Sequence, residues 1–312
     1  MSEIRIINQF PNWYAPEFDE NRWNSQFNHS NVIINSDVYE ADYPEHWGPL
    51  SLKFAFKGSE YYETDNCRYR VRDGRFLLMN EDQRYSSSIR ETGTTRSFSI
   101  NYCPRYRKER ISELVLSESK LMDEPDFILD SGVNFFSGLY DYDIKLMGKV
   151  LQLKTYLDGL NYGSLFIGER LSDILKDIVG INIQKLSQLN KLNNCKASTR
   201  VEIYRRLTRG KDYIDSNYNE SISLEILGKV SSLNAHHFLR KFKEFMGVTP
   251  HQYLTQVRMH EAERLLKNGE LSITEVCLNT GFEDPASFSK LFKRTFGDSP
   301  NAYRRRIYTT RP

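Results

Sequence analysis

The sequence predicts an α+β fold, in which a β-barrel followed by helices precedes an all-α domain with two helix-turn-helix units joined by a long helix. Three observations lead to this prediction. Short alternations of apolar and polar residues recur between about residues 32 and 102, which is typical of strands. From residue 144 onward, apolar residues recur at three- and four-residue intervals, which is typical of helices. One helical pattern near the C-terminus also occurs about fifty residues earlier.

Length and composition limit the kind of protein. A chain of 312 residues can form two domains that each bury a core. No run of about 18 apolar residues predicts a membrane span, and the N-terminus lacks the basic-then-apolar order of a secretion signal. The cysteines are scattered without metal-ligand spacing and suit buried thiols in a reducing compartment. They are Cys67, Cys103, Cys195 and Cys277. We therefore expect a cytoplasmic protein with no cofactor and no bound metal.

Residues 1–142 are expected to form the barrel together with an N-terminal arm. Residues 1–25 are rich in aromatic residues and show no clear period, so they form either an arm packed on the barrel or a disordered end. Segment 52–56 alternates apolar and polar residues, and Gly74 lies in a turn signal before the apolar segment 76–79. Several strands at this short spacing predict a barrel or a jelly roll.

Residues 143–192 are expected to form two amphipathic helices. Segments 144–157 and 165–192 each carry an apolar stripe, and Gly180 is expected to interrupt the second helix. Such a pair of helices can form a dimer interface, or its stripes can pack on the barrel of the same chain. The block 143–192 is assigned to dimerisation on this basis, with both alternatives open. Residues 193–198 are short and polar, as a linker would be.

Residues 199–312 contain two copies of one helical pattern. In the second copy, Asp284 is suited to cap a helix, Pro285 to its first turn and Gly297 to its end. A shorter apolar helix precedes each copy, and a short helix, a tight turn and a second helix with a polar outer face form a helix-turn-helix unit. The matched pairs are Phe238 and Phe288, Phe242 and Phe292, Lys243 and Lys293, Gly247 and Gly297, Pro250 and Pro300, and Tyr253 and Tyr303.

These residues resemble the DNA-binding domain of the AraC family of transcription regulators, in which one long helix joins two helix-turn-helix units. The resemblance covers about the last third of the chain and is most specific from Gly281 to Arg304. Here Pro250 opens the long helix and Gly269 follows its end. Segment 69–80 resembles the cupin-like sensor domain that precedes many such domains. The resemblance implies a DNA-binding regulator that is not an enzyme. Its implied partners are double-stranded DNA, a second copy of the chain, a small-molecule effector and, for an activator, RNA polymerase.

Charge is distributed unevenly along the chain. Residues 199–312 carry 19 basic and 13 acidic side chains, a net charge of +6, whereas the remaining residues carry 24 basic and 28 acidic side chains, a net charge of −4. A basic C-terminal domain fits contact with DNA, because each neutralised phosphate releases bound counterions.

The polar outer face of the second helix in each unit supplies the predicted DNA contacts. Arg240 is predicted to read guanine, because its planar fork can bond O6 and N7 together. Lys290 and Lys293 are predicted to bind phosphate. Pro285 and Ala286 have no polar side-chain group, so recognition there would be apolar or through DNA shape. The predicted contact residues are His236, His237, Leu239, Arg240, Lys243, Pro285, Ala286, Ser289, Lys290 and Lys293.

Aromatic residues of the barrel are predicted to line an effector site, because an aromatic-lined barrel can enclose a ligand. They are Trp47, Phe54, Phe56, Tyr69, Phe76 and Tyr85. Only His29 and His46 precede residue 236, which argues against a metal enzyme of the cupin type. Two alternatives to an effector-controlled regulator remain. One is a regulator controlled by a partner protein or by dimerisation alone, and the other is a cupin enzyme fused to a DNA-binding domain.

Overall fold

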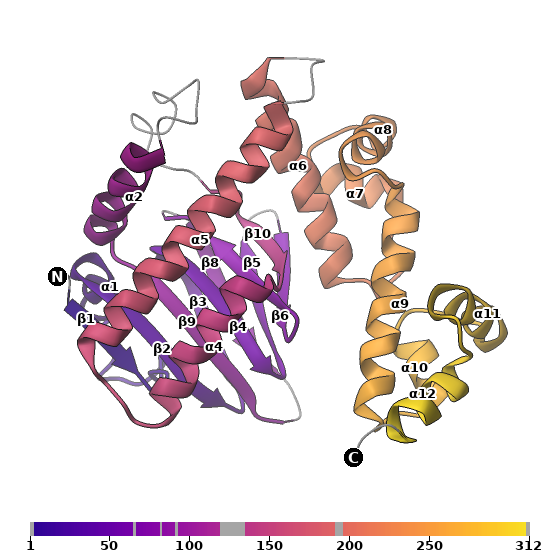
Figure 1. Cartoon of the computed structure of the whole chain (residues 1–312), viewed down its shortest axis with the longest axis horizontal. Coiled ribbons are helices and arrows are strands. Elements are labelled where there is room, and N and C mark those ends of the chain that lie inside the picture. Colours follow the sequence, from indigo (N-terminus) through magenta and orange to yellow (C-terminus); the bar gives the residue numbers. More distant parts are fainter. Residues whose placement is uncertain are drawn as a thin grey trace. The chain divides into compact units, whose positions relative to one another are not determined.

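The computed structural model describes residues 3–64, 67–81, 83–90, 93–118, 135–190 and 196–309 (Figure 1). The chain divides into two compact units, Met1–Arg205 and Arg206–Pro312. Helix α6, Ala197–Ser216, begins in the first unit and ends in the second. The fold is mixed, with sheets in the first unit and helices in the second. In the described part of the chain, no helix combines the length and the apolar character that a membrane crossing requires.

The described residues of the first unit form two sheets and four helices that precede α6. The six-stranded sheet has the order β1-β2-β9-β4-β7-β10, and the four-stranded sheet has the order β3-β8-β5-β6. The strands of the larger sheet are β1 Glu3–Ile7, β2 Ser30–Val38, β9 Thr95–Tyr102, β4 Leu50–Lys57, β7 Arg75–Met79 and β10 Gly138–Asp141. Those of the smaller sheet are β3 Ala41–Gly48, β8 Gln83–Ile89, β5 Ser59–Thr64 and β6 Cys67–Arg72. The helices are α1 Glu20–His29, α2 Pro104–Glu118, α4 Ile144–Asp158 and α5 Ser164–Asn190.

The two sheets do not close into the single barrel that the sequence predicted. Among the described strands, the hydrogen-bond ladders form two separate sheets. The chain changes sheet at Gly58, between β4 and β5, and at Gly74, between β6 and β7. Both glycines have positive φ angles, 73° and 90°, which a residue with a side chain adopts only with strain. These tight turns move the chain from one sheet to the other instead of continuing one ladder.

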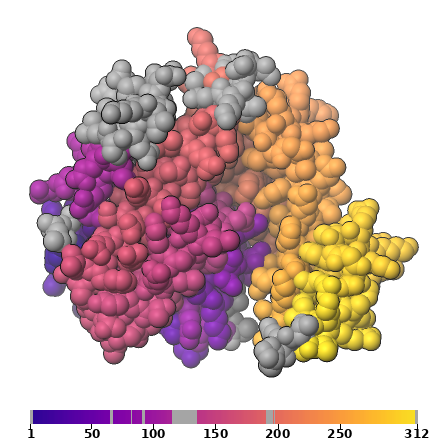
Figure 2. Space-filling view, viewed as in Figure 1, coloured from indigo at the N-terminus to yellow at the C-terminus, as the bar shows by residue number. Residues whose placement is uncertain are grey.

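The main apolar core of the first unit lies on the outer face of the larger sheet. Along β4, Leu52 and Phe54 point toward this core, where they meet Val150 of α4 and Leu171 of α5. Helices α4 and α5 lie across this face, and their atoms hide much of the sheet in the space-filling view (Figures 1 and 2). The apolar stripes of α4 and α5 therefore pack on the sheet of their own chain, which is one of the two expected alternatives.

Helix α5 runs without a break through Gly180, contrary to the expected interruption. Ile178 and Val179, directly before the glycine, are buried in the core against the sheet. A glycine inside a helix costs only about 1 kcal/mol relative to alanine, so this burial is sufficient to keep the helix continuous.

The described residues of the second unit form the end of α6 and six further helices. They are α7 Leu224–Val230, α8 Ala235–Met246, α9 Pro250–Asn268, α10 Ile273–Asn279, α11 Pro285–Phe296 and α12 Pro300–Thr309. Helices α7 and α8 form one helix-turn-helix unit, helices α10 and α11 form the other, and the long helix α9 joins them (Figure 1). The expected all-α architecture of this part is confirmed.

Candidate nucleic-acid interface

Helix α8 is held by an apolar inner face and a cap at each end. The side chain of Asn234 accepts a hydrogen bond from the amide of His236, and Gly247 ends the helix in the left-handed conformation. Phe238 and Phe242 are completely buried on the inner face, with their ring centroids 5.2 Å apart. These anchors fix the helix so that its other face stays open to a partner.

Helix α11 has the same construction. Asp284 accepts hydrogen bonds from the amides of Ala286 and Ser287, and Pro285 occupies the first turn. Hydrogen bonds from the Ser287 side chain and from both amides lower the pKa of the Asp284 carboxyl. Phe288 and Phe292 are completely buried and pack with α9 and α12 in the core of this half of the unit.

Four exposed basic residues lie on the outer faces of α8 and α11, and we call them the basic contact set. They are Arg240, Lys243, Lys290 and Lys293. Within the residues that the structure describes, no carboxylate forms an ion pair with any of the four, whereas Lys241 on α8 pairs with Glu244 at 2.8 Å. Their charges therefore remain available for a negatively charged partner.

The other predicted contact residues differ in exposure. His236, Pro285 and Ala286 are exposed, as expected for an outward face. His237, Leu239 and Ser289 are half-buried. Leu239 also lines an apolar hollow together with residues of α6, α7 and α9, so much of its side chain packs within the unit.

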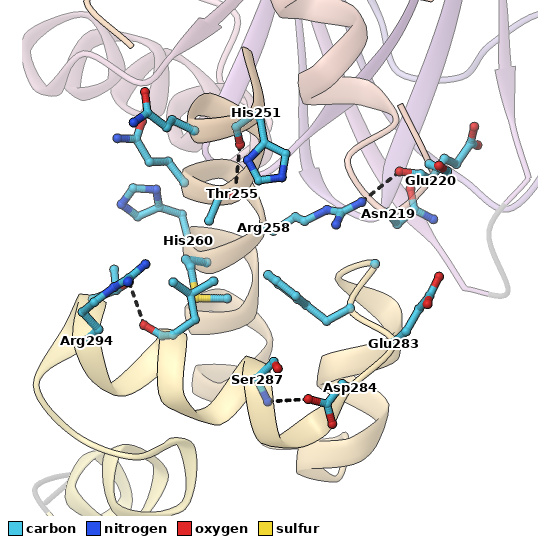
Figure 3. Close-up of a pocket in the computed structure, with 18 of the residues that line it drawn as sticks. Asn219, Glu220, His251, Thr255, Arg258, His260, Glu283, Asp284, Ser287 and Arg294 are labelled. Carbon is cyan, nitrogen blue, oxygen red and sulfur yellow. Dashed lines mark hydrogen bonds between the residues drawn. The ribbon is translucent and has the colours of Figure 1, made fainter. Parts of the chain in front are cut away.

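A groove of about 980 Å³ lies between α9 and α11 (Figure 3). Thr255 and Arg258 of α9 line it, together with Ser287 and Arg294 of α11. None of these four residues was predicted from the sequence to belong to a site. Helical spacing was the only signal for them, since Ser287 and Arg294 share one exposed face of α11.

Arg258 contacts two segments of the chain inside this groove, one between α6 and α7 and one between α10 and α11. Its Nε donates to the carbonyl of Tyr218 at 2.7 Å, and a terminal nitrogen donates to the carbonyl of Glu220 at 2.9 Å. The guanidinium also lies 5.5 Å from the ring centroid of Phe282, directly before α11. One side chain of α9 thus contacts both the segment that follows α6 and the segment that precedes α11 in the second helix-turn-helix unit.

The basic C-terminal residues have mostly structural partners. Arg304 donates to the carbonyl of Leu271, and Arg306 pairs with Asp298 at 2.8 Å. Arg305 is exposed. Arg304 and Arg306 therefore help to hold α12 in place within the unit Arg206–Pro312.

The six aromatic residues predicted for an effector site do not lie together. Trp47 and Tyr85 line a small cavity between the two sheets of the first unit. Phe54, Phe56 and Phe76 instead belong to the core beneath α4 and α5. The two helices cover the outer face of the larger sheet, so its largest apolar side chains point outward to meet them and do not line the space between the sheets.

The sixth of these residues, Tyr69, is buried on β6 and pairs in register with Tyr62 of β5. Tyr62 lines the cavity, whereas Tyr69 is not among its lining residues. The sequence pattern identified strands correctly here but did not identify which strands surround the cavity.

Known proteins match this chain mainly in its C-terminal part. The helix-turn-helix domain family matches residues 227–306. The Msm operon regulatory protein of Streptococcus mutans is 32% identical over 119 residues, which are 38% of this chain and 41% of that protein. The transcriptional activator RhaS of Yersinia pestis is 29% identical over 211 residues, which are 65% of this chain and 75% of that protein.

A solved DNA-binding domain of AdpA, in complex with a target DNA, is 30% identical, and the match covers 34% of this chain and 96% of that domain with a TM-score of 0.33. The match with the Streptococcus mutans protein spans less than half of that protein's length. The named relatives are regulators of transcription and not enzymes. The matched residues 227–306 run from within α7 into α12, and this C-terminal part is a helix-turn-helix domain of the AraC type.

Proposed function

We propose that this protein is a sequence-specific regulator of transcription that binds double-stranded DNA through both helix-turn-helix units. The observation that carries the proposal is the basic contact set, four exposed cations on the matched outer faces of α8 and α11. Buried phenylalanines anchor α8 and α11 in the same way, so each helix presents a rigid outer face. A rigid helix with an exposed polar face can enter the major groove, and two such helices can read one site.

The two units differ in the contacts that they offer. Helix α8 presents Arg240, whose fork suits guanine, beside the exposed His236. Helix α11 presents Pro285 and Ala286 at its start, which offer no polar side-chain group to a base. We therefore assign more of the base recognition to α8 and more of the phosphate binding to Lys290 and Lys293 of α11.

The test is the salt dependence of DNA binding by the full chain. Affinity for duplex DNA should fall linearly with the logarithm of salt concentration, because bound phosphates release counterions. Lys290→Ala and Lys293→Ala should each reduce that slope by about one unit. Lys241→Ala is the matched control, because Lys241 already pairs with Glu244 and should leave the slope unchanged. An affinity that is independent of salt would refute the proposal.

We also propose that the first unit is a sensor of the cupin-like type, which responds to a small molecule and controls DNA binding. The cavity between its two sheets, lined by aromatic rings and buried polar side chains, supports this assignment. A homodimer and, for an activator, RNA polymerase complete the proposed set of partners. Sedimentation of the full chain with and without operator DNA would test the dimer, and a monomer bound to DNA would exclude it.

A further inference from the structure

The space between the two sheets of the first unit is polar around its cavity. Along β4, Ser51 and Lys53 point away from the apolar core, and along β9 Ser99 and Asn101 do the same. All four side chains are nevertheless almost completely buried. The inner faces of two packed sheets normally carry the apolar core. Here the largest apolar cluster lies under the helices, and buried polar side chains share the space between the sheets with apolar ones such as Ile34.

Three of these residues, Lys53, Ser99 and Asn101, line a small cavity of about 40 Å³. Strands of both sheets line it, and so do Trp13 of the N-terminal segment and Trp23 of α1. The rings of Trp13 and His46 lie 5.3 Å apart at the cavity, and those of His46 and Tyr85 lie 4.5 Å apart. The cavity therefore combines aromatic walls with buried polar groups, which is typical of sites for small polar molecules.

Lys53 supplies a positive charge inside this cavity. It is 5% exposed, and its Nζ donates one hydrogen bond, to the side-chain oxygen of Asn101 at 3.1 Å. The amide of Asn101 donates to the Val32 carbonyl and to Ser99, which fixes the oxygen toward Lys53. An ammonium has three donors, so two remain for another acceptor.

Aromatic rings provide the rest of the surroundings of Nζ. It lies 5.9 Å from the ring centroid of Tyr62 and 5.3 Å from that of Tyr85. Across the described ranges, no carboxylate forms an ion pair with Lys53. Rings stabilise a cation less than a paired carboxylate does inside a protein. The charge is buried without the partner that would offset its desolvation.

Glu60 is the acidic residue of the cavity lining, and it forms no ion pair with Lys53 in the described structure. It is 1% exposed, and one of its oxygens accepts a hydrogen bond from Ser97 at 2.8 Å. Burial raises the pKa of the Glu60 carboxyl, while hydrogen bonds from Ser97 and Tyr62 and the positive charge of Lys53 act to lower it. Among the described residues Lys53 forms no ion pair with Glu60, so two of its ammonium donors remain for another acceptor.

We infer that this cavity binds a small organic carboxylate, whose oxygens accept hydrogen bonds from Lys53 while the rest of the molecule packs against the aromatic walls. The inference rests on the proposed control by a small molecule and gives that molecule a chemical class. The volume limits the ligand to a few heavy atoms. A cationic ligand would be repelled by Lys53, and a neutral polyol would leave the buried charge unpaired.

The experiment measures thermal unfolding of the full chain with three carboxylates and their uncharged amides. The probes are acetate, lactate and pyruvate, compared with acetamide, lactamide and pyruvamide at one ionic strength. At least one carboxylate should raise the melting temperature in proportion to the logarithm of its concentration, whereas its amide should not, because only a ligand that binds the folded state stabilises it.

Lys53→Met tests the role of the ammonium directly. The variant keeps the length and apolar stem of the side chain and should bind the same carboxylate roughly ten- to a hundredfold more weakly. Lys57→Met is the matched control, since it removes a charge from an exposed position of the same strand and should retain the full shift. If Lys53→Met does not fold, the comparison of carboxylate with amide on the wild-type chain decides alone.

Three results would overturn the inference. They are equal stabilisation by carboxylate and amide, an unchanged shift in folded Lys53→Met, and no stabilisation by any probe. DNA binding measured in the same samples separates this inference from the proposed function. Salt-dependent DNA binding without a carboxylate effect removes only the ligand class, whereas loss of DNA binding in the wild-type chain removes the proposed function itself.

Discussion

Asp284 shows how one carboxylate can begin a helix and make that helix sensitive to pH. Its hydrogen bonds at the start of α11 hold its pKa below the usual value of about 3.9. A carboxyl with a lowered folded pKa stabilises the fold above its unfolded pKa, and this stability is lost as the pH falls through the folded pKa. The second unit should therefore lose part of its stability as the pH falls below about 4.

Two variants distinguish the hydrogen bonds of the cap from the titration of the Asp284 carboxyl. Asp284→Ala should lower the urea midpoint of the second unit at neutral pH, because the α11 amides lose their acceptor. Asp284→Asn keeps an acceptor that does not titrate, so its midpoint should change less with pH below 4 than that of the wild type. Identical pH profiles for wild type and Asp284→Asn would exclude this carboxylate as a source of acid sensitivity.

Arg240 is the residue on which direct base recognition depends most strongly in our proposal. Arg240→Ala should cost roughly 1–3 kcal/mol on the preferred DNA site and relax the preference at one base pair. Lys290→Ala should weaken binding to all sequences about equally. Selection of binding sites from random DNA at fixed salt compares the two. A preference that survives Arg240→Ala but disappears in Lys290→Ala would reverse the assignment of the two helices.

Single residues were predictable from the sequence where their role is local. The cap of Asp284, the first-turn position of Pro285 and the helix end at Gly297 are all confirmed, because each depends only on neighbours in the chain. Lys53 was not predictable in the same way. Alternation along β4 indicates that its two faces differ, but it does not reveal that helices cover the face of Phe54 and that Lys53 faces a cavity.

Among the elements, α9 does more than connect the two helix-turn-helix units. Arg258 binds the carbonyls of Tyr218 and Glu220 and lies over Phe282. Gly281, next to Phe282, has a φ of 79°, and a Cβ there would lie 2.9 Å from the Arg258 side chain. The close approach allowed by this glycine lets one guanidinium contact both the segment between α6 and α7 and the segment before α11.

Loss of the Arg258 contacts should therefore make DNA binding less sensitive to the spacing between the two contact regions of the DNA site. Arg258→Lys keeps the charge but cannot bond two carbonyls with a planar fork. The wild type should lose affinity when one base pair is inserted between its two contact regions, and Arg258→Lys should lose less. Affinity for the two DNA sites measures this difference. Arg264→Lys, at an ion pair with Glu261 on the same helix, is the control and should keep the wild-type penalty.

At the scale of the whole molecule, the two halves differed in how far the sequence predicted them. The second unit follows from repeated local signals, since capping residues, helical spacing and left-handed glycines occur twice in register. The first unit depends on contacts between distant strands. Its strands were recognisable, but the ladder order and the change of sheet at Gly58 and Gly74 depend on tertiary pairing, so the predicted barrel is not confirmed and the described strands form two separate sheets.

Each unit also has an apolar core of its own, which predicts two separate unfolding transitions. Leu153 is completely buried in the core of the first unit, and Phe292 is completely buried in that of the second. Leu153→Ala should cost about 2–5 kcal/mol and Phe292→Ala about 3–5 kcal/mol, because each leaves a cavity in a packed core. Calorimetry of the full chain should show that each variant lowers the temperature of one unfolding transition and leaves that of the other unchanged.

Helix α6 runs through both units and is the element through which they could unfold together. If both variants lower one shared transition, α6 couples the two cores, and a ligand bound in the first unit can then act on the DNA-binding helices through stability alone.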